Sequence, residues 1–216
     1  MEEKIISRFR SLDTTSVSDA MDKLGIECCA YRIKPVHTGL KLCGRAFTVH
    51  YVPCGVIQGT VGDFLDDVQP GQVVVIDNAG RDECTVWGDI MAKTAKLRGI
   101  EGTVIDGVCR DIPTVLESGY PVFSKGYYMR TGKDRVRVDA VNTPVQLSDI
   151  PVYPGDIILG DDTGVVVIPD SRAEEVAAIA EEIEEKEQKI FELVSQGMAL
   201  KDARRQIGYH RLQTRE

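Results

Sequence analysis

Two carboxylates and a guanidinium stand near the beginnings of two predicted helices. Backbone N–H groups at a helix N-terminus bind anions, and a guanidinium makes strong, directional hydrogen bonds to a developing enolate oxygen. A carboxylate can ligate Mg²⁺ or Mn²⁺. Together these groups indicate chemistry that makes or breaks a carbon–carbon bond beside a 2-oxo acid. The residues are Gly88, Asp89, Ile90 and Met91, which open a helix predicted over 88–98, and Arg110 and Asp111, which open one predicted over 111–118.

Each of these residues has an expected role in such a site. The backbone at Gly88 to Met91 would bind a substrate carboxylate, Arg110 would hold the enolate oxygen, and Asp111 would ligate the metal. Asp89, beside a metal-bound water, could shuttle protons. A structural role is an alternative for both acids: Asp111 is a typical helix N-cap, and Asp89 suits the positive end of a helix dipole.

The elements that position these residues are two apolar strands joined by a helix. Residues 73–76 and 103–106 are continuous apolar runs, which is typical of strands covered on both faces. A helix between such strands implies parallel pairing with a right-handed crossover. Ligands bind beyond the carboxyl ends of parallel strands, and this is where the two acids and the arginine are expected. Residues 77–80 are predicted to be a loop.

The remaining elements are expected to complete one α/β domain over residues 1–216. Thr14, Thr15 or Ser16 is expected to cap the first of these helices, and Ser171 with Glu174 reads as a capping box for the last. Glu187 stands on the apolar seam of that last helix. The glycines of 54–64 do not match a dinucleotide or P-loop motif. The predicted elements are a helix over 13–25, a strand over 45–52, a loop entering a short helix over 54–64, strands at 121–124, 135–139, 156–159 and 165–168, and a long helix over 171–197.

Composition narrows the possible partners. The 216 residues carry a net charge of −8, so a nucleic-acid surface is not expected. A C-terminal cluster of Arg204, Arg205, Arg211 and Arg215 is expected to be a solvated tail. No window is apolar enough for a membrane span, and the N-terminal residues do not resemble a signal peptide, so we expect a cytoplasmic protein with no membrane partner.

The cysteines and histidines do not suggest a metal centre. Six cysteines without a C-x-x-C spacing are expected to be free thiols in a reducing compartment. Cys109 stands beside Arg110 but has no histidine nearby in sequence, so a nucleophilic role for it is disfavoured. His37, His50 and His210 are far apart in sequence, which argues against a three-histidine zinc site.

Two sequence motifs resemble one family. The stretch Trp87 to Met91, the stretch Gly102 to Gly107 and the pair Arg110-Asp111, with twenty residues between Asp89 and Arg110, are similar to the signature of the RraA-like family. The residues from Pro154 to Pro169 resemble its second half. Within the family the similarity is greatest to the 4-hydroxy-4-methyl-2-oxoglutarate aldolases, which also decarboxylate oxaloacetate. The resemblance covers most of residues 13–195.

This resemblance implies an activity and a role for each matched residue. It implies a divalent-metal-dependent (Mg²⁺ or Mn²⁺) lyase that releases pyruvate through an enolate. Gly88, Asp89, Ile90 and Met91 match the loop that binds the pyruvate moiety. Arg110 matches the arginine on the keto oxygen, and Asp111 matches the metal ligand. Lys133 stands where these aldolases often have a lysine near the substrate, although a turn lysine is an equal alternative.

The resemblance also implies a fold and an assembly. The family fold is a single-domain α/β/β/α sandwich of the swivelling β/β/α type, which assembles as a homotrimer or a hexamer. Its active site lies between subunits, and a neighbour's C-terminal helix supplies an acidic residue. Here that helix is the one predicted near 171–197, and Glu187 is a candidate for the acid.

Two other functions remain open on the sequence. Some members of the family bind ribonuclease E and regulate it without the full catalytic set; Gly88-Asp89 and Arg110-Asp111 favour the enzyme. A lyase for another oxo acid is also possible, because loops build the distal pocket. A menaquinone methyltransferase is excluded, because no glycine-rich motif for S-adenosylmethionine follows a predicted strand.

Overall fold

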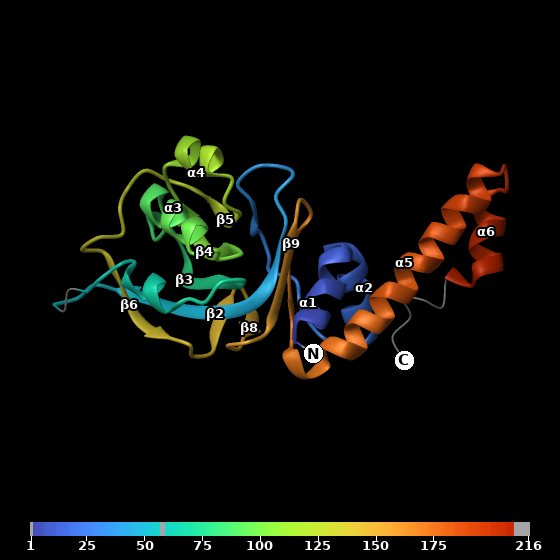
Figure 1. Cartoon of the computed structure of the whole chain (residues 1–216), viewed down its shortest axis with the longest axis horizontal. Helices are drawn as coiled ribbons and strands as arrows, with labels where there is room; N and C mark the ends of the chain where they lie inside the picture. Colours follow the sequence, from blue (N-terminus) through green and yellow to red (C-terminus); the bar gives the residue numbers. More distant parts are fainter. Residues whose placement is uncertain (1, 57–58, 210–216) are drawn as a thin grey trace.

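The computed structural model describes residues 2–56 and 59–209 (Figure 1). The strands are β1 (Lys34–Pro35), β2 (Leu42–Pro53), β3 (Gln72–Thr85), β4 (Gly102–Cys109), β5 (Val122–Tyr127), β6 (Val136–Val141), β7 (Val145–Leu147), β8 (Ile150–Val152), β9 (Ile157–Asp161) and β10 (Gly164–Ile168). The helices are α1 (Glu2–Ser11), α2 (Thr14–Lys23), α3 (Asp89–Leu97), α4 (Ile112–Ser118), α5 (Ala173–Ser195) and α6 (Leu200–Ile207), with short 3₁₀ turns η1 (Asp63–Asp67) and η2 (Asp170–Arg172).

One mixed sheet carries most of the strands. Its order is β1-β5-β4-β3-β2-β9-β10, with β6 paired to the end of β2, and β7 and β8 form a separate hairpin. β2, β3, β4 and β5 are parallel, while β9 and β10 run antiparallel to their neighbours. The predicted parallel pairing of 73–76 with 103–106 is confirmed. The carboxyl ends of the four parallel strands therefore share one edge.

Three separate hydrophobic clusters define the layers. Alternation along the strands sends Val74 and Ile76 toward α3 and α4, whereas Val73 and Val75 face β9, β10 and the β7–β8 hairpin. Val166, on the outer side of β10, packs with α1, α2 and α5. The layers are thus α3 and α4, the parallel strands, then β9 and β10 with the β7–β8 hairpin, and finally α1, α2 and α5. The expected α/β/β/α sandwich is confirmed. Figure 1 shows α3 and α4 on one side of the β structure and α1, α2 and α5 on the other.

The prediction of a loop at residues 77–80 is wrong. β3 continues through it to Thr85, and its register against β4 jumps between Asp77 and Arg81. The Asp77 Oδ1 atom accepts a hydrogen bond from the Ala79 N–H at 2.9 Å, and Ala79 has a φ of +51°. This side-chain turn produces a bulge within the strand. The polar, glycine-containing sequence therefore marks an irregularity of the ladder and not its end.

The helix ends also differ from those expected. Asp13, and not Thr14, Thr15 or Ser16, caps α2, because its Oδ1 accepts the Ser16 N–H at 2.7 Å. Ser171 lies in η2, so no capping box forms and the N-cap position of α5 is Arg172. Helix α1 was not expected. The C-terminal arginine cluster was expected to be a tail; Arg204 and Arg205 belong to α6, while Arg211 and Arg215 lie outside the described residues.

None of the helices in the described part of the chain combines the length and apolarity needed to cross a membrane. The longest, α5, runs away from the sheet, and α6 folds back beside it (Figure 1). The N-terminal half of α5 packs on α1 and α2, and its residues Val176, Ala180 and Ile183 are buried there. Beyond the body of the fold, α5 carries the exposed Phe191. The site described next lies at the opposite end of the molecule.

Candidate functional site

The two predicted helix starts lie side by side at the carboxyl edge of the parallel strands. β3 ends at Thr85 and leads through Trp87 and Gly88 into α3, and β4 ends at Cys109 and leads through Arg110 into α4. The Arg110 N–H donates a hydrogen bond to the Trp87 carbonyl oxygen at 3.0 Å, which ties the two connections together. The structure therefore brings together residues that are twenty-two positions apart in the chain.

Asp111 joins the two helices through its side chain. Its Oδ2 atom accepts a hydrogen bond from the Asp89 N–H at 3.2 Å and lies 3.3 Å from Arg110 Nε. Asp111 stands at the N-cap position of α4, as the local sequence predicts, but its side chain caps the neighbouring helix α3 instead of its own. Its φ of +59° is in the left-handed region, where a residue other than glycine costs about 1–2 kcal/mol. Such strain is typical of functional positions.

Gly88 leaves the space that this contact needs. Its backbone is extended, so any residue could adopt the conformation. A Cβ atom there would lie 2.7 Å from Asp111 Oδ2 and 3.3 Å from Arg110 Nε, which is closer than ordinary van der Waals contact. A larger residue here would displace the Asp111 and Arg110 side chains, so glycine preserves their positions and does not serve to relieve backbone strain.

A cleft of about 460 Å³ opens over these residues. Arg110 lies in its wall, and Lys133 contributes from the loop that follows β5. Two contacts hold that loop against the end of β3: the Thr85 N–H donates to the Arg130 carbonyl oxygen at 3.0 Å, and Gly132 packs directly on the Thr85 carbonyl. The cleft thus places two cationic side chains around one space, which suits an anionic ligand. Its lining residues are Gly59, Thr60, Val61, Gly62, Thr85, Val86, Trp87, Gly88, Asp89, Ile90, Met91, Arg110, Thr131 and Lys133.

The side chains that open α3 point in different directions. The Asp89 carboxylate lies 3.9 Å from Lys93 Nζ on the same helix, so only the backbone of Asp89 contacts Asp111. Ile90 is 76% exposed at the cleft mouth. Met91 packs against the backbone at Gly62. Sequence reasoning missed this last wall, at residues 59–62, because its glycines match no binding motif.

Behind the cleft lie large, buried side chains. Trp87 is buried and stacks on Tyr120, with ring centroids 6.0 Å apart, and its indole N–H has no hydrogen-bond partner among the described residues. Cys109 is also fully buried, and burial raises the pKa of its thiol. A buried thiol with a raised pKa is a poor nucleophile, which agrees with the expectation for Cys109.

Asp111 is the residue that suits a metal. No cluster of three or more histidine, cysteine, aspartate or glutamate side chains that could hold a metal occurs within residues 2–56 and 59–209. The Asp111 side chain is 36% exposed, and its recorded contacts within residues 2–56 and 59–209 use the Oδ2 atom alone. A hard cation such as Mg²⁺ binds through one or two carboxylates and keeps several waters. The residues present fit such a cation and do not fit a structural zinc site.

Glu187 does not reach this cleft within one chain. It lies on α5, at the far side of the β structure from α3 and α4 (Figure 1). Burial raises the pKa of its carboxyl group, and the negative charge of Asp19 on α2 adds to this. The Tyr209 hydroxyl donates a hydrogen bond to Glu187 Oε1 at 3.4 Å. A role for Glu187 in catalysis therefore requires a second copy of the chain.

The fold and the site together define an α/β sandwich with a cleft at the carboxyl ends of parallel strands. The profile of the RraA-like family (Aldolase/RraA) matches residues 14–167, which include every strand from β1 to β9 and the whole cleft. The chain belongs to the RraA-like family.

Individual relatives support this assignment. The "Putative 4-hydroxy-4-methyl-2-oxoglutarate aldolase" of Halalkalibacterium halodurans is 34% identical over 177 residues, which are 81% of each chain. Protein DlpA of Legionella pneumophila is 36% identical over 208 residues, and this chain spans only about a third of its length, 34%. A crystal structure of an uncharacterized Pseudomonas syringae protein superimposes with a TM-score of 0.89 at 41% identity, covering 94% of this chain and 98% of that one.

Proposed function

We propose that this protein is a carbon–carbon lyase that cleaves 4-hydroxy-4-methyl-2-oxoglutarate, or a related 4-hydroxy-2-oxo acid, to release pyruvate, and that it also decarboxylates oxaloacetate. The observation that carries the proposal is the contact of Arg110 and Asp111 at the N-terminus of α3, on one side of a cleft lined by cationic groups. The name of the Halalkalibacterium relative supports the same reaction class.

Both reactions form the same enolate. In the aldol cleavage a base removes the proton of the C4 hydroxyl, the C3–C4 bond breaks, and the electron pair moves onto the 2-oxo oxygen while C4 becomes a carbonyl. In oxaloacetate the C3–C4 bond breaks with loss of carbon dioxide. Protonation at C3 then gives pyruvate in each case. A protein that stabilises the enolate oxygen therefore accelerates both reactions.

Arg110 is the residue placed to stabilise that oxygen. Its side chain is 40% exposed in the cleft wall, and Asp111 holds it through Nε, so the terminal guanidinium nitrogens are available to a ligand. Fixed N–H donors aimed at a developing oxyanion typically contribute about 100- to 1000-fold in rate. Lys133 would pair with a substrate carboxylate at the other side of the cleft.

A divalent cation, Mg²⁺ or Mn²⁺, would bind at Asp111 and supply Lewis-acid polarisation of the 2-oxo acid. The remaining requirements fall to the chain itself. The Asp89 N–H and Arg110 fix the orientation of the Asp111 carboxylate, and the buried Trp87 forms part of the cleft wall.

The cleft also indicates a second copy of the chain as partner. Large apolar side chains are exposed in its neighbourhood: Ile90, which lines the cleft, is 76% accessible, and Tyr127 and Met129, at the end of β5 and in the chain that leads on to Lys133, are 70% and 76% accessible. Exposed apolar clusters of this kind mark interfaces. We propose a homo-oligomer, a trimer or hexamer, in which α5 of a neighbour, with Glu187, approaches this edge.

An assay panel tests the lyase. Pyruvate release is measured from oxaloacetate and from several 4-hydroxy-2-oxo acids, with Mg²⁺ or Mn²⁺ and with EDTA. We expect metal-dependent turnover that falls at least about 100-fold in Arg110→Ala. The variant Arg98→Ala is a matched control, because Arg98 pairs with Asp66 on the same helical layer but outside the cleft lining. Absence of turnover on every 4-hydroxy-2-oxo acid would refute the proposed reaction.

The same assay distinguishes the proposed lyase from a lyase for another oxo acid and from a regulator, and light scattering measures the mass of the assembly. Turnover on a different oxo acid alone would retain the lyase and change its substrate. A well-folded protein that turns over none of them, and that binds ribonuclease E, would be a regulator of the kind that the family also contains. Met129→Lys tests the assembly, because a charge in an apolar interface should shift the mass toward a monomer.

A further inference from the structure

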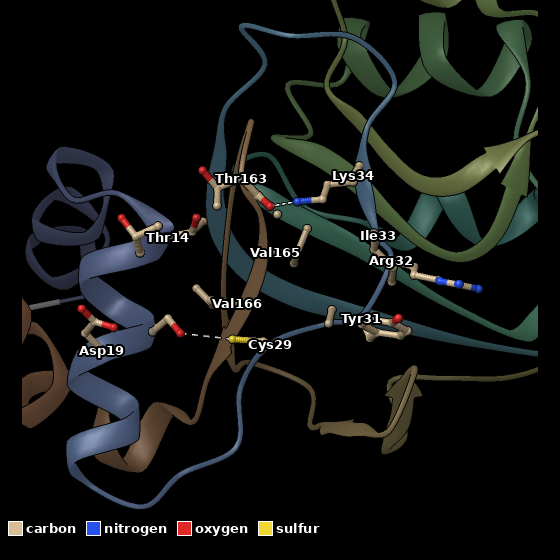
Figure 2. A pocket seen from close by; sticks show the side chains of 14 residues that line it. Thr14, Asp19, Cys29, Tyr31, Arg32, Ile33, Lys34, Thr163, Val165 and Val166 are labelled. Atoms are coloured by element: carbon tan, nitrogen blue, oxygen red, sulfur yellow. Dashed lines mark hydrogen bonds between the residues drawn. The ribbon is translucent and has the colours of Figure 1, made fainter. Parts of the chain in front are cut away.

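A second cavity, separate from the cleft, is lined by one member of a pair of adjacent cysteines. It has a volume of about 440 Å³ and lies between α2, the segment that follows it, and β10 (Figure 2). Cys28 is 3% exposed and packs in the core with α2 and α5, whereas the adjacent Cys29 is exposed and lines the cavity. The segment is held in place because the Val167 N–H donates to the Cys28 carbonyl oxygen at 3.0 Å.

The two sulfur atoms are in direct contact. Cys28 Sγ lies 3.6 Å from Cys29 Sγ, and the Ser18 hydroxyl on α2 lies 3.2 Å from Cys29 Sγ. In Figure 2 the Cys29 side chain points from its loop toward α2, and a dashed line marks the Ser18 contact. Side chains of adjacent residues in extended chain normally point to opposite sides. Here both thiols turn toward one point, one from the core and one from the cavity.

The environment favours the thiolate at Cys29. Hydrogen bonds from Cys28 and then from Ser18 lower the pKa of Cys29 to about 6, against the effects of partial burial and of the carboxylates of Asp22 and Glu27. The hydrogen bond to Cys29 and burial raise the pKa of Cys28. A thiolate beside a neutral thiol is the arrangement of an attacking and a resolving cysteine.

We propose that Cys28 and Cys29 form a redox modification site that reacts with hydrogen peroxide or a small organic hydroperoxide to give a reversible disulfide between adjacent residues. The Cys29 thiolate attacks one peroxide oxygen, the O–O bond breaks, and hydroxide (or the alkoxide) leaves, which produces a sulfenic acid on Cys29. The Cys28 thiol then attacks that sulfur, the S–O bond breaks and water leaves. Two thiols are oxidised and one peroxide is reduced.

The other cysteines lack this arrangement. Cys43, Cys84 and Cys109 are buried, and burial raises the pKa of each thiol. Cys54 is partly exposed and has no recorded thiol neighbour within residues 2–56 and 59–209, so it is the matched control. The proposal does not depend on the lyase activity, and it is tested without substrate.

The experiment treats the full-length protein with hydrogen peroxide at pH 7 and maps its tryptic peptides by mass spectrometry. Cleavage after Lys23 and Arg32 isolates residues 24–32, which contain both cysteines. We expect this peptide to lose two hydrogen atoms, to resist alkylation and to recover with dithiothreitol. In Cys28→Ser a sulfenic acid should accumulate on Cys29, and dimedone should trap about ten-fold more of it than in the unmodified protein.

Two further variants keep the proposal falsifiable if Cys28→Ser disturbs the core. Cys29→Ser alters an exposed side chain and should abolish peroxide modification of the 24–32 peptide. Cys54→Ser should leave the disulfide yield unchanged. The proposal is overturned if peroxide leaves the 24–32 peptide as a dithiol, if Cys54 oxidises as fast as Cys29, or if Cys28 is oxidised equally well in Cys29→Ser.

Discussion

Replacing Gly88 by alanine should inactivate the site without unfolding the protein. The new Cβ would stand 2.7 Å from Asp111 Oδ2 and 3.3 Å from Arg110 Nε. To restore ordinary contact, the carboxylate must retreat by more than half an ångström, which breaks its 3.2 Å hydrogen bond to the Asp89 N–H. The backbone at residue 88 is extended and accepts alanine, so the cost falls on the two side chains and not on the fold.

The size of the effect follows from this displacement. A misplacement of about 1 Å at reacting groups costs roughly 100-fold in rate, so we expect kcat for oxaloacetate to fall by about 100-fold. The loss of stability should stay near 1 kcal/mol, the usual cost of exchanging a favourable N-cap residue for alanine. Binding of Mn²⁺, measured by titration calorimetry, should weaken in parallel, because Asp111 is the proposed ligand.

A matched control separates this effect from a general sensitivity of glycines near the cleft. Gly126 lies on β5 beside the site, but a Cβ there would meet nothing nearer than Val108 Cγ1 at 3.9 Å. Gly126→Ala should therefore keep kcat, metal affinity and melting temperature. Full activity of Gly88→Ala, or an equal loss in both variants, would refute the reasoning that the Asp111 contact organises the site.

Three further predictions concern stability, measured by denaturant unfolding. Burial disfavours the charged form of Asp161, but hydrogen bonds from the start of α2 outweigh burial and lower its pKa. A lowered pKa adds stability above the unfolded value of about 3.9 and loses it as the pH falls through the folded value. Asp161→Asn should therefore cost about 2 kcal/mol at pH 7, and the difference from the unmodified protein should vanish in acid; a constant difference would contradict this. Gly132→Ala would press a Cβ into the Thr85 carbonyl oxygen and should destabilise by about 1–3 kcal/mol; an unchanged midpoint would exclude the contact. Lys125→Met leaves the buried Asp106 carboxylate without its cation and should cost about 3–5 kcal/mol, of which Asp106→Asn should restore a part; no recovery would show that the pair is not the cause.

The parallel strands could be predicted because strands that are buried on both faces are continuous apolar runs in the sequence. Val73 to Ile76 are apolar at every position, since helices cover one face and β9, β10 and the hairpin cover the other. The bulge at Asp77 could not be predicted, because an aspartate-led turn looks the same whether a strand ends or continues. Helix α1 did carry a signal: Ile5 and Phe9 within it and Leu12 directly after it recur at helical spacing and are all buried.

The candidate site was predictable in its residue types but not in its contacts. Spacing along the chain indicates that Asp89 and Arg110 lie at the same sheet edge, because both follow parallel strands. It does not indicate that Asp111 turns to a left-handed conformation and caps the other helix, since that choice depends on the neighbouring chain segment. The roles of these residues, of Lys133 and of Glu187 stay predictions for the assays above.

The three-cluster core has a consequence for how the chain folds during synthesis. The buried residues of the cluster between α3, α4 and the sheet run from Phe47 to Val136, and the partly buried ones around them from Val36 to Val141, so this cluster can be assembled while the later chain is still being made. The cluster around α1 and α2 also needs β9, β10 and α5. Arg8, for example, pairs with Glu181, 173 positions later. Helices α1 and α2 must therefore wait for β9, β10 and α5, more than 130 positions later in the chain, before their apolar faces are covered.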